Sequence, residues 1–334
     1  MLQAMTERLI DDVRNGGSIP AQRLDVVLNS ISPIARDIKA YEFLSGSGEP
    51  LPPHEPGAYI DLHLVDGLVR SYSLIPSSDV SPGAYTIAVK RDPASRGGSR
   101  YIHDKFRVGD HVSISAPRNN FRLNESADHS VFFAGGIGIT PIWNMIRRLE
   151  SIKRGWTLFY SCRTRAEMAF AEELQDNNNA HLYFDDENQG VPPDIGQVVA
   201  KLPKDRHLYC CGPAPMLGAF EVATESWPNP QIHIERFVAK YEPLRAGGFT
   251  VYLARSKQEI FVAEGQTILE TLLDEGVDVD CSCEAGICGT CVQRVISGIP
   301  EHKDSFLSPE QAAENDLIVI CCSGSKSERL VLDL

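Results

Sequence analysis

Hydrophobic and polar residues alternate over short segments in the first third of the chain, after a weakly helical stretch at Met5–Arg14. Proline, glycine and aspartate residues separate these segments, as turns separate strands. The pattern is typical of a small antiparallel barrel in which each strand buries one face. The expected strands are Leu24–Ile34, Tyr59–Leu64, Leu68–Leu74, Tyr85–Lys90 and His111–Ala116.

The pattern changes near Asp128, where short apolar runs begin to alternate with helical segments. Such alternation indicates a parallel α/β sheet. The expected strands are Ser130–Ala134, Trp156–Ser161, His181–Phe184 and His207–Cys211, and the expected helices are Pro141–Ile152 and Met168–Gln175.

A polar linker containing glycine, Val238–Gly248, precedes a third region. That region begins with a hairpin-like pair, Phe249–Arg255 and Gln258–Ala263, and an amphipathic helix at Thr267–Glu275. We therefore expect a multi-domain chain. Its parts are an extension at 1–22, a barrel at 23–125, an α/β domain at 126–238, a linker at 239–248 and a last domain at 249–334.

Charge narrows the range of partners. The formal net charge is −13, which argues against nucleic acid. Residues 249–334 hold 15 acidic and 6 basic residues, which forms either a solvated surface or a docking face for a basic partner. No apolar run reaches the length of a membrane helix, and Glu7, Asp11 and Asp12 do not suit a signal peptide. We expect a cytoplasmic protein that does not bind membranes.

Six of the nine cysteines lie in the last quarter of the chain. Cys283, Cys288 and Cys291 have the C-x4-C-x2-C spacing of plant-type 2Fe–2S proteins, and Cys321 follows an apolar strand thirty residues later. The small residues between them let the backbone wrap closely and point its N–H groups at the sulfurs. We predict that these four cysteines are the metal ligands.

Two alternatives accompany the cysteine loop. Zinc is the competing metal, but structural zinc sites usually use two CxxC-like knuckles and this loop has one. Cys281 and Cys322 flank the predicted ligands and could replace them, although the spacing favours Cys283 and Cys321.

Two turns at strand ends indicate a nucleotide site. The first, Ala134–Pro141, is glycine-rich and leads into a helix, where Pro141 suits the first turn and Thr140 can cap. It lacks the G-x-G-x-x-G pattern, and taken alone it could also be a tight strand–helix turn. The second is a Cys-Gly-Pro turn, whose cysteine could also be a buried structural residue. Together they favour a dinucleotide at the carboxyl edge of the sheet. The predicted contacts are Gly135, Gly136, Gly138, Thr140, Pro141, Cys211, Gly212, Pro213 and Met216.

Within the expected barrel, Arg70, Ser71, Tyr72 and Ser73 form an R-x-Y-S tetrapeptide. An arginine suits a phosphate, an aromatic ring suits a flavin, and a hydroxyl can reach a ring nitrogen. The tetrapeptide alone is common. Its position before the two nucleotide turns is what makes it informative.

The order of these four motifs resembles the phthalate dioxygenase reductase and vanillate demethylase reductase family, in the ferredoxin–NADP reductase superfamily. The resemblance runs from about Arg23 to Leu334. It implies a flavin-binding antiparallel β-barrel, an α/β nucleotide-binding domain with a parallel sheet, and an α+β, β-grasp 2Fe–2S ferredoxin domain.

The resemblance also implies the cofactors and their contacts. FMN is implied rather than FAD, with NADH as the electron donor. Cys211 would lie beside the nicotinamide, and Phe237 would close over the flavin, so that Ser73, Cys211 and Phe237 are the residues at the reacting atoms. Further implied flavin contacts are Val89, Lys90, Gly97, Gly98 and Ser99.

The region after the second α/β strand leaves NADPH use open. Arg163 and Arg165 could meet a ribose phosphate, whereas Asp185 and Asp186 would oppose one.

The implied function is electron transfer from NADH through FMN and the 2Fe–2S cluster to a terminal Rieske-type oxygenase acting in aromatic degradation. We expect a monomer. Another acceptor, such as a ferredoxin or a cytochrome-type monooxygenase, is the first alternative. A redox sensor is the second, and the intact flavin and nucleotide motifs argue against it.

Overall fold

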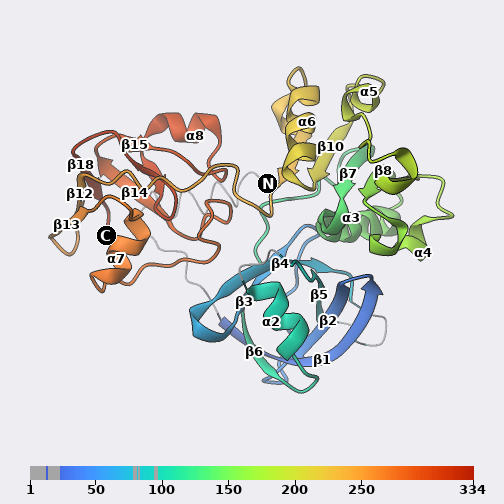
Figure 1. Cartoon of the computed structure of the whole chain (residues 1–334), viewed down its shortest axis with the longest axis horizontal. Helices are drawn as coiled ribbons and strands as arrows, with labels where there is room; N and C mark the ends of the chain where they lie inside the picture. The colour runs from blue at the N-terminus through green and yellow to red at the C-terminus, as the bar shows by residue number, and fades with distance from the viewer. Residues whose placement is uncertain (1–12, 14–22, 78–80, 82, 94–96) are drawn as a thin grey trace. The chain divides into compact units, whose positions relative to one another are not determined.

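The computed structural model describes residues 13, 23–77, 81, 83–93 and 97–334. The helix expected at Met5–Arg14 lies almost wholly outside the described residues. The chain divides into two compact units, residues 22–236 and a second unit that includes residues 237–334. The first holds the barrel and the α/β sheet, and the second holds the cysteine loop (Figure 1).

The first sheet closes into a barrel in which every described strand pair is antiparallel, as predicted. A short helix, α2 (Gly98–Lys105), follows the fifth strand, and η1 (Val65–Gly67) joins two others. Alternate residues fill the barrel, where Leu28, Phe43 and Ile60 are fully buried. In the order β1-β2-β5-β4-β3-β6, the strands are Arg23–Ala35, Ile38–Ser45, Tyr85–Lys90, Val69–Ile75, Tyr59–His63 and His111–Ser115.

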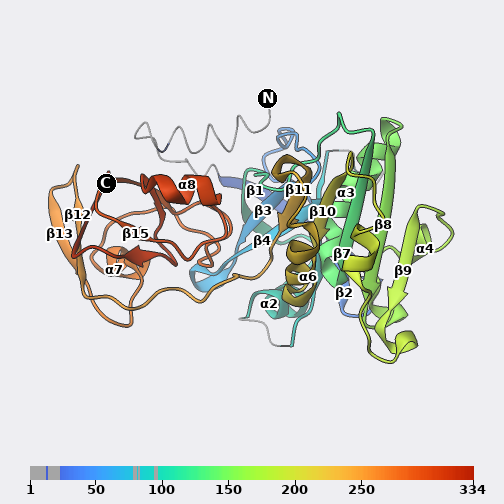
Figure 2. The same cartoon turned by 90° about the horizontal axis from the view of Figure 1, so that it is seen from above.

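The second sheet is parallel and has helices on both faces, which confirms the α/β prediction. Helix α3 (Ile139–Ser151) covers one face, and α5 (Ile195–Val199) and α6 (Ala214–Thr224) cover the other (Figure 2). In the order β11-β10-β7-β8-β9, the strands are Ile232–Glu235, His207–Cys211, His129–Gly135, Gly155–Cys162 and Ala180–Phe184. The remaining short helices are η2 (Gly136–Gly138), η3 (Arg165–Glu167), α4 (Ala171–Leu174), η4 (Asp185–Asn188) and η5 (Asn229–Gln231).

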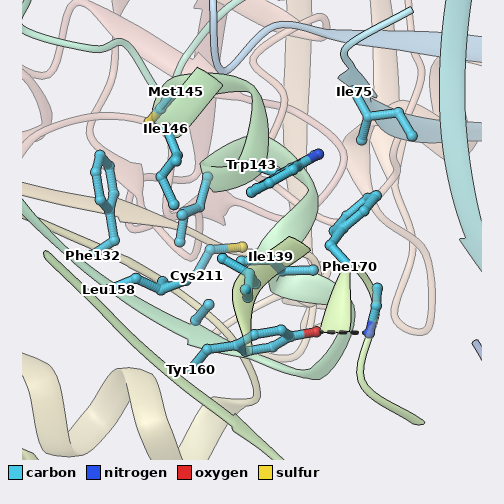
Figure 3. Packing of buried hydrophobic residues seen from close by; sticks show 14 of the residues in the cluster. Ile75, Phe132, Ile139, Trp143, Met145, Ile146, Leu158, Tyr160, Phe170 and Cys211 are labelled. Carbon is cyan, nitrogen blue, oxygen red and sulfur yellow. Dashed lines mark hydrogen bonds between the residues drawn. The ribbon is translucent and has the colours of Figure 1, made fainter. Parts of the chain in front are cut away.

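Barrel and α/β sheet share one hydrophobic core. Ile75 of β4 and Trp143 of α3 belong to the same buried cluster (Figure 3). The Asn144 side chain of α3 also donates a hydrogen bond of 3.2 Å to the carbonyl oxygen of Leu74 in β4. The strand that carries the R-x-Y-S residues is therefore fixed to the helix that begins at the glycine-rich turn.

The second unit is a mixed sheet packed against α7 (Ile268–Asp274), which confirms the expected α+β fold. Thr267 and Glu270 form a capping box at the start of α7. Its sheet, in the order β13-β12-β18-β14-β16, consists of Gln258–Val262, Phe249–Leu253, Arg329–Leu332, Val292–Ser297 and Leu317–Val319, and a small sheet pairs β15 (Pro300–Glu301) with β17 (Gly324–Ser325). Helix α8 (Pro309–Glu314) precedes β16.

Two helix predictions need correction. The helix expected at Met168–Gln175 is α4, only Ala171–Leu174, because Phe170 takes a left-handed backbone conformation with φ of 59°. Helix α3 begins at Ile139 rather than Pro141, so Thr140 lies inside it. The Thr140 hydroxyl donates to the carbonyl oxygen of Ile137 at 3.0 Å and does not cap the helix. Pro141 lies in the first turn, as predicted.

Candidate functional site

Arg70 and the start of α2 form a cradle for an anion. A Cβ atom added to Gly98 would lie 2.6 Å from Cγ of Arg70, so glycine is what lets the arginine cross the start of the helix. Gly97 precedes the helix with φ of 98°, which L side chains rarely adopt. The Ser99 hydroxyl accepts a hydrogen bond from the Asp92 amide at 3.2 Å. A guanidinium and the free N–H groups of a helix start together suit a phosphate.

The other R-x-Y-S residues divide between the two faces of β4. Strand alternation places Tyr72 on the face of Arg70 and Ser73 on the face of Ser71. The Ser71 hydroxyl donates to Oδ1 of Asp61 at 2.6 Å, which gives it a structural partner. Burial raises the pKa of Tyr72, so its hydroxyl stays protonated.

Ser73 has a buried hydroxyl that meets no hydrogen-bond partner among the described residues. Buried hydroxyls are normally bonded, so an absent group is a natural partner for this one. The cradle at Arg70 fits the phosphate of a flavin, and the Ser73 hydroxyl offers a separate donor on the other face of β4.

Val89 and Lys90 end strand β5 and play different parts. The Val89 side chain is buried in the barrel core, and its carbonyl oxygen accepts a 2.8 Å hydrogen bond from Nε2 of His103. Its side chain is therefore committed to packing. Nζ of Lys90 lies 3.0 Å from Oε2 of Glu167, which joins the barrel to the α/β sheet.

The two predicted nucleotide turns pack directly against each other. A Cβ atom on Gly138 would lie 2.2 Å from the Cys211 carbonyl oxygen, and one on Gly135 would lie 2.5 Å from Cδ of Pro213. One on Gly212 would lie 2.6 Å from Sδ of Met216. These glycines therefore serve the close packing of two protein segments.

Gly136 differs from the other glycines of this turn. It has φ of 54°, and a Cβ atom there would meet nothing within 4 Å. It is the glycine that leaves backbone open to a ligand at the start of α3.

Cys211 ends β10 and is completely buried, in the core cluster that includes Ile139 (Figure 3). Burial raises the pKa of its thiol well above the ordinary value. The thiol is therefore neutral, and it can act on a neighbouring ring by contact and shape but not as a thiolate.

Glu235 is a partly buried acid, with its Oε2 atom shielded from solvent, that sequence reasoning did not single out. It ends β11 and pairs in register with Cys211. Burial raises its pKa to about 8, and its Oε2 atom has no hydrogen-bond partner in the described part of the chain. The sequence did show a glutamate at the end of a strand, next to the strand that carries the Cys-Gly-Pro turn. It could not show that solvent is excluded from this glutamate, which is evident only in three dimensions.

The arginines after β8 are not equivalent. Arg165 is paired with both carboxylate oxygens of Glu187 and lies over the Phe184 ring, 4.2 Å from its centre. Arg163 contributes its carbonyl oxygen to the Asp186 amide at 3.1 Å. Arg165 is thus already engaged by an acid that the sequence patterns did not identify.

Phe237 is the first residue after the first compact unit, and 41% of its surface is exposed. Its predicted contact with the flavin stays a prediction.

Hydrogen bonds join the predicted cluster ligands Cys283 with Cys288 and Cys291 with Cys321, and Cys321 is also bonded to Cys322. A hydrogen bond with Cys288 is the main cause that raises the pKa of Cys283, and a hydrogen bond with Cys291 is the main cause that lowers the pKa of Cys321. Among the described residues, no three His, Cys, Asp or Glu side chains group as ligands of a single ion. Two pairs of sulfurs are what a two-iron centre needs, with two thiolates for each iron.

The backbone of the cysteine loop fits a buried cluster. The Ala285 amide donates to the Cys283 sulfur at 3.4 Å. Gly286 and Gly289 have φ of 68° and 77°, and Cβ atoms on them would lie 2.5 Å from Sγ of Cys322 and 2.2 Å from the Phe306 ring. No residue with a side chain fits at either place without displacing a neighbour.

Cys281 and Cys322 differ in their surroundings. Cys322 is buried, with its sulfur 3.7 Å from the carbonyl oxygen of Val319, whereas Cys281 is partly exposed. That they are neighbours rather than ligands stays a prediction.

Comparison with known protein families identifies two domains of the chain. Residues 132–221 match the oxidoreductase NAD-binding domain, and residues 251–325 match the 2Fe-2S iron-sulfur cluster binding domain. The chain is therefore an oxidoreductase that combines a nicotinamide-binding domain with an iron–sulfur domain.

Full-length relatives define the family. The phenoxybenzoate dioxygenase subunit beta of Ectopseudomonas oleovorans is 44% identical, over 92% of this chain and 96% of that protein. The tetrachlorobenzoquinone reductase of Sphingobium chlorophenolicum is also 44% identical, over 94% and 99%. The vanillate O-demethylase oxidoreductase of Acinetobacter baylyi is 40% identical, over 93% and 99%.

Solved structures agree. Phthalate dioxygenase reductase has a TM-score of 0.71 and 36% identity, over 93% of this chain and 98% of that one. A type IV self-sufficient cytochrome P450 monooxygenase has a TM-score of 0.83 and 34% identity, and this chain spans 41% of its length. The chain belongs to the phthalate dioxygenase reductase and vanillate O-demethylase oxidoreductase family, as predicted.

Proposed function

We propose that this protein is the NADH-dependent reductase component of a Rieske-type oxygenase or demethylase system that acts on a small aromatic compound. One observation carries the proposal. The strand with Arg70, Tyr72 and Ser73 and the helix that begins at the glycine-rich turn share one core, and the same chain carries a 2Fe–2S domain. A hydride donor, a flavin and a one-electron centre are the parts that such a relay requires.

The residues of the first unit support FMN as the flavin. Arg70 and the first turn of α2 would hold its phosphate, Tyr72 would contact the ring system, and the unpartnered Ser73 hydroxyl would donate to it. Bound flavin would supply the conversion of a hydride into two single electrons. Cys211 would limit the approach of the nicotinamide.

The ion pair at the edge of the α/β sheet supports NADH as the preferred donor. The Glu187 carboxylate is already paired with the Arg165 guanidinium, and Asp185 and Asp186 precede Glu187 in the chain. A 2′-phosphate would have to displace Glu187 and approach two further carboxylates.

The names of the relatives support a separate oxygenase as the partner. The relatives include a dioxygenase subunit and demethylase oxidoreductases. We infer a cytoplasmic monomer that delivers electrons to a separate terminal oxygenase. Among the described residues, no helix combines the length and apolar character needed to cross a bilayer.

A second acceptor class has specific support. One relative is named for the reduction of tetrachlorobenzoquinone, and another homologous module is part of a cytochrome P450 chain. The second candidate is therefore direct reduction of a quinone or delivery to a P450-type monooxygenase, with the same internal relay.

The experiment measures cofactors and acceptors on one preparation. Extraction should release FMN, the visible and EPR spectra should show a 2Fe–2S cluster, and NADH should drive rapid reduction of cytochrome c. Turnover of an aromatic substrate by a Rieske oxygenase supplied from the same genome would support the first candidate. Fast reduction of chlorinated quinones without any oxygenase turnover would favour the second, and absence of flavin would refute both.

A further inference from the structure

A buried acid lies beside the cysteine loop without being one of its ligands. Asp304 belongs to the segment between β15 and α8, and its side chain is only 2% exposed. Its Oδ2 atom accepts hydrogen bonds from the amides of Phe306 and Leu307, at 3.1 Å and 2.7 Å. One carboxyl oxygen thus fixes the backbone two and three residues further along the chain.

The segment Asp304–Phe306 touches the cysteine loop at both of its left-handed glycines. The Ser305 amide donates to the Gly286 carbonyl oxygen at 2.9 Å, and the backbone of Asp304 packs against the same glycine. The Phe306 ring lies over Gly289. The segment therefore covers the loop at two points between its cysteines.

The same segment is tied to the chain that carries the fourth predicted ligand. The Lys303 amide donates to the Ser323 hydroxyl oxygen at 3.1 Å, two residues after Cys321. The Gly286 amide also donates a hydrogen bond to the Cys321 sulfur. Asp304 is therefore linked through short contacts to both stretches that supply ligands.

His302 is the group that faces the free oxygen of Asp304. Its Nδ1 atom lies 3.7 Å from Oδ1, and the described residues offer neither ring nitrogen a hydrogen bond. A buried carboxyl oxygen without a partner is costly, and imidazole can supply a donor after a small rotation.

We propose that Asp304, supported by His302, is a positioning residue that holds the cysteine loop closed over the cluster. It touches no iron. It acts through the two amides, through Phe306 on Gly289 and through Ser305 on Gly286. Outer residues of this kind fix the hydrogen bonds and solvent access of a metal centre, which set its potential and its retention of metal. The inference rests on the cluster of the proposed relay and is independent of the acceptor.

The test uses holoprotein of the full chain and three variants. Asp304→Ala removes both accepted hydrogen bonds, so a chelator should strip iron about 10–100-fold faster, and the EPR g-values and midpoint potential should shift. Asp304→Asn keeps an acceptor oxygen and should retain the wild-type g-values and slow iron loss. Glu310→Gln is the matched control, because this exposed acid accepts a hydrogen bond from the nearby Ser308 hydroxyl and should leave all three readouts unchanged.

The outcomes separate positioning from general stability. Wild-type g-values, potential and iron loss in folded Asp304→Ala would overturn the proposal, as would an Asn variant as impaired as the Ala variant. Should Asp304→Ala fail to fold, His302→Ala decides, since an unchanged potential and rate of iron loss there would refute it. A wild-type protein without a 2Fe–2S spectrum would instead refute the proposed function.

Discussion

The chain has two glycine-rich loops that bind different kinds of group, and they are built differently. In the nucleotide turn, Gly135 and Gly138 are required because another protein segment packs against them, and Gly136 alone is open. In the cysteine loop, Gly286 and Gly289 take left-handed conformations beneath Cys322 and Phe306. The first loop is packed without its ligand, as suits a substrate that binds and leaves, whereas the second brings together cysteines of the kind that bind a metal cluster.

Removing one predicted cluster ligand should have the largest effect. It should abolish the function of the cysteine loop and leave that of the nucleotide turn intact. Cys288→Ser takes one thiolate from a predicted iron, so NADH-driven cytochrome c reduction should fall at least about 100-fold. Reduction of ferricyanide by NADH, which needs only the flavin, should persist. Cys281→Ser is the matched control and should keep the cluster. Loss of the cluster in that control would contradict the ligand assignment.

On the nucleotide side, Glu235 should make stability depend on pH. Burial raises its pKa from 4.5 to about 8, so the folded protein keeps a proton that the unfolded chain releases. The free energy of unfolding should therefore fall as pH rises from about 4.5 to about 8 and change little above that. Glu235→Gln should remove this slope and stabilise the first unit by roughly 4 kcal/mol at most near pH 8.

Urea unfolding between about pH 5 and pH 8, followed by tryptophan fluorescence, checks this prediction. Trp143, Trp156 and Trp227 all lie in the first unit, so the signal reports that unit. An equal slope in wild type and variant would show that Glu235 is not the group responsible.

Gly138→Ala tests whether the nucleotide turn needs glycine because another protein segment packs against it. Its new methyl would lie 2.2 Å from the Cys211 carbonyl oxygen, which is backbone and cannot move aside cheaply. We expect destabilisation of about 1–3 kcal/mol and a raised KM for NADH. Gly218→Ala, in α6 with open space around it, is the control and should be neutral or slightly stabilising. Thermal melts and steady-state kinetics of both variants decide the matter.

The smallest expected effect concerns the choice of nicotinamide. Glu187→Gln releases the Arg165 guanidinium, so the ratio of kcat/KM for NADPH to that for NADH should rise about two- to fivefold. Glu172→Gln removes an acid in α4 that has no role in this pair and should leave the ratio unchanged. A fall in the ratio for Glu187→Gln would contradict the proposed role of the ion pair.

Sequence patterns predicted those elements in which the hydrophobic pattern along the chain matches the burial of the residues in the fold. The barrel strands, the parallel strands and the cysteine loop have clear periodicity or spacing, and the structure has them. Strand β2 was not predicted, because Glu42 is buried among apolar neighbours and interrupts the alternation. Asn29 donates to that carboxylate at 2.8 Å, a partner 13 residues away that no local pattern reveals.

Helix α6 was also not predicted, since Pro215 and Gly218 are poor helix formers. The proline falls in the first turn, where a missing N–H costs nothing. For the candidate site, motifs identified the residues that meet cofactors by type, but not Glu235, Glu187 or Asp304. Their importance comes from burial and from partners on other strands, which spacing along the chain cannot encode.

The common core of the barrel and the α/β sheet has a practical consequence for anyone who wishes to recombine this reductase with others. Ile75 and Trp143 pack into one hydrophobic core, so dividing the chain near residue 125 would leave two fragments with exposed apolar surfaces. A junction at 236/237 leaves that interior whole. Chimaeras that exchange the iron–sulfur module there should fold, whereas those that exchange the flavin module alone should aggregate.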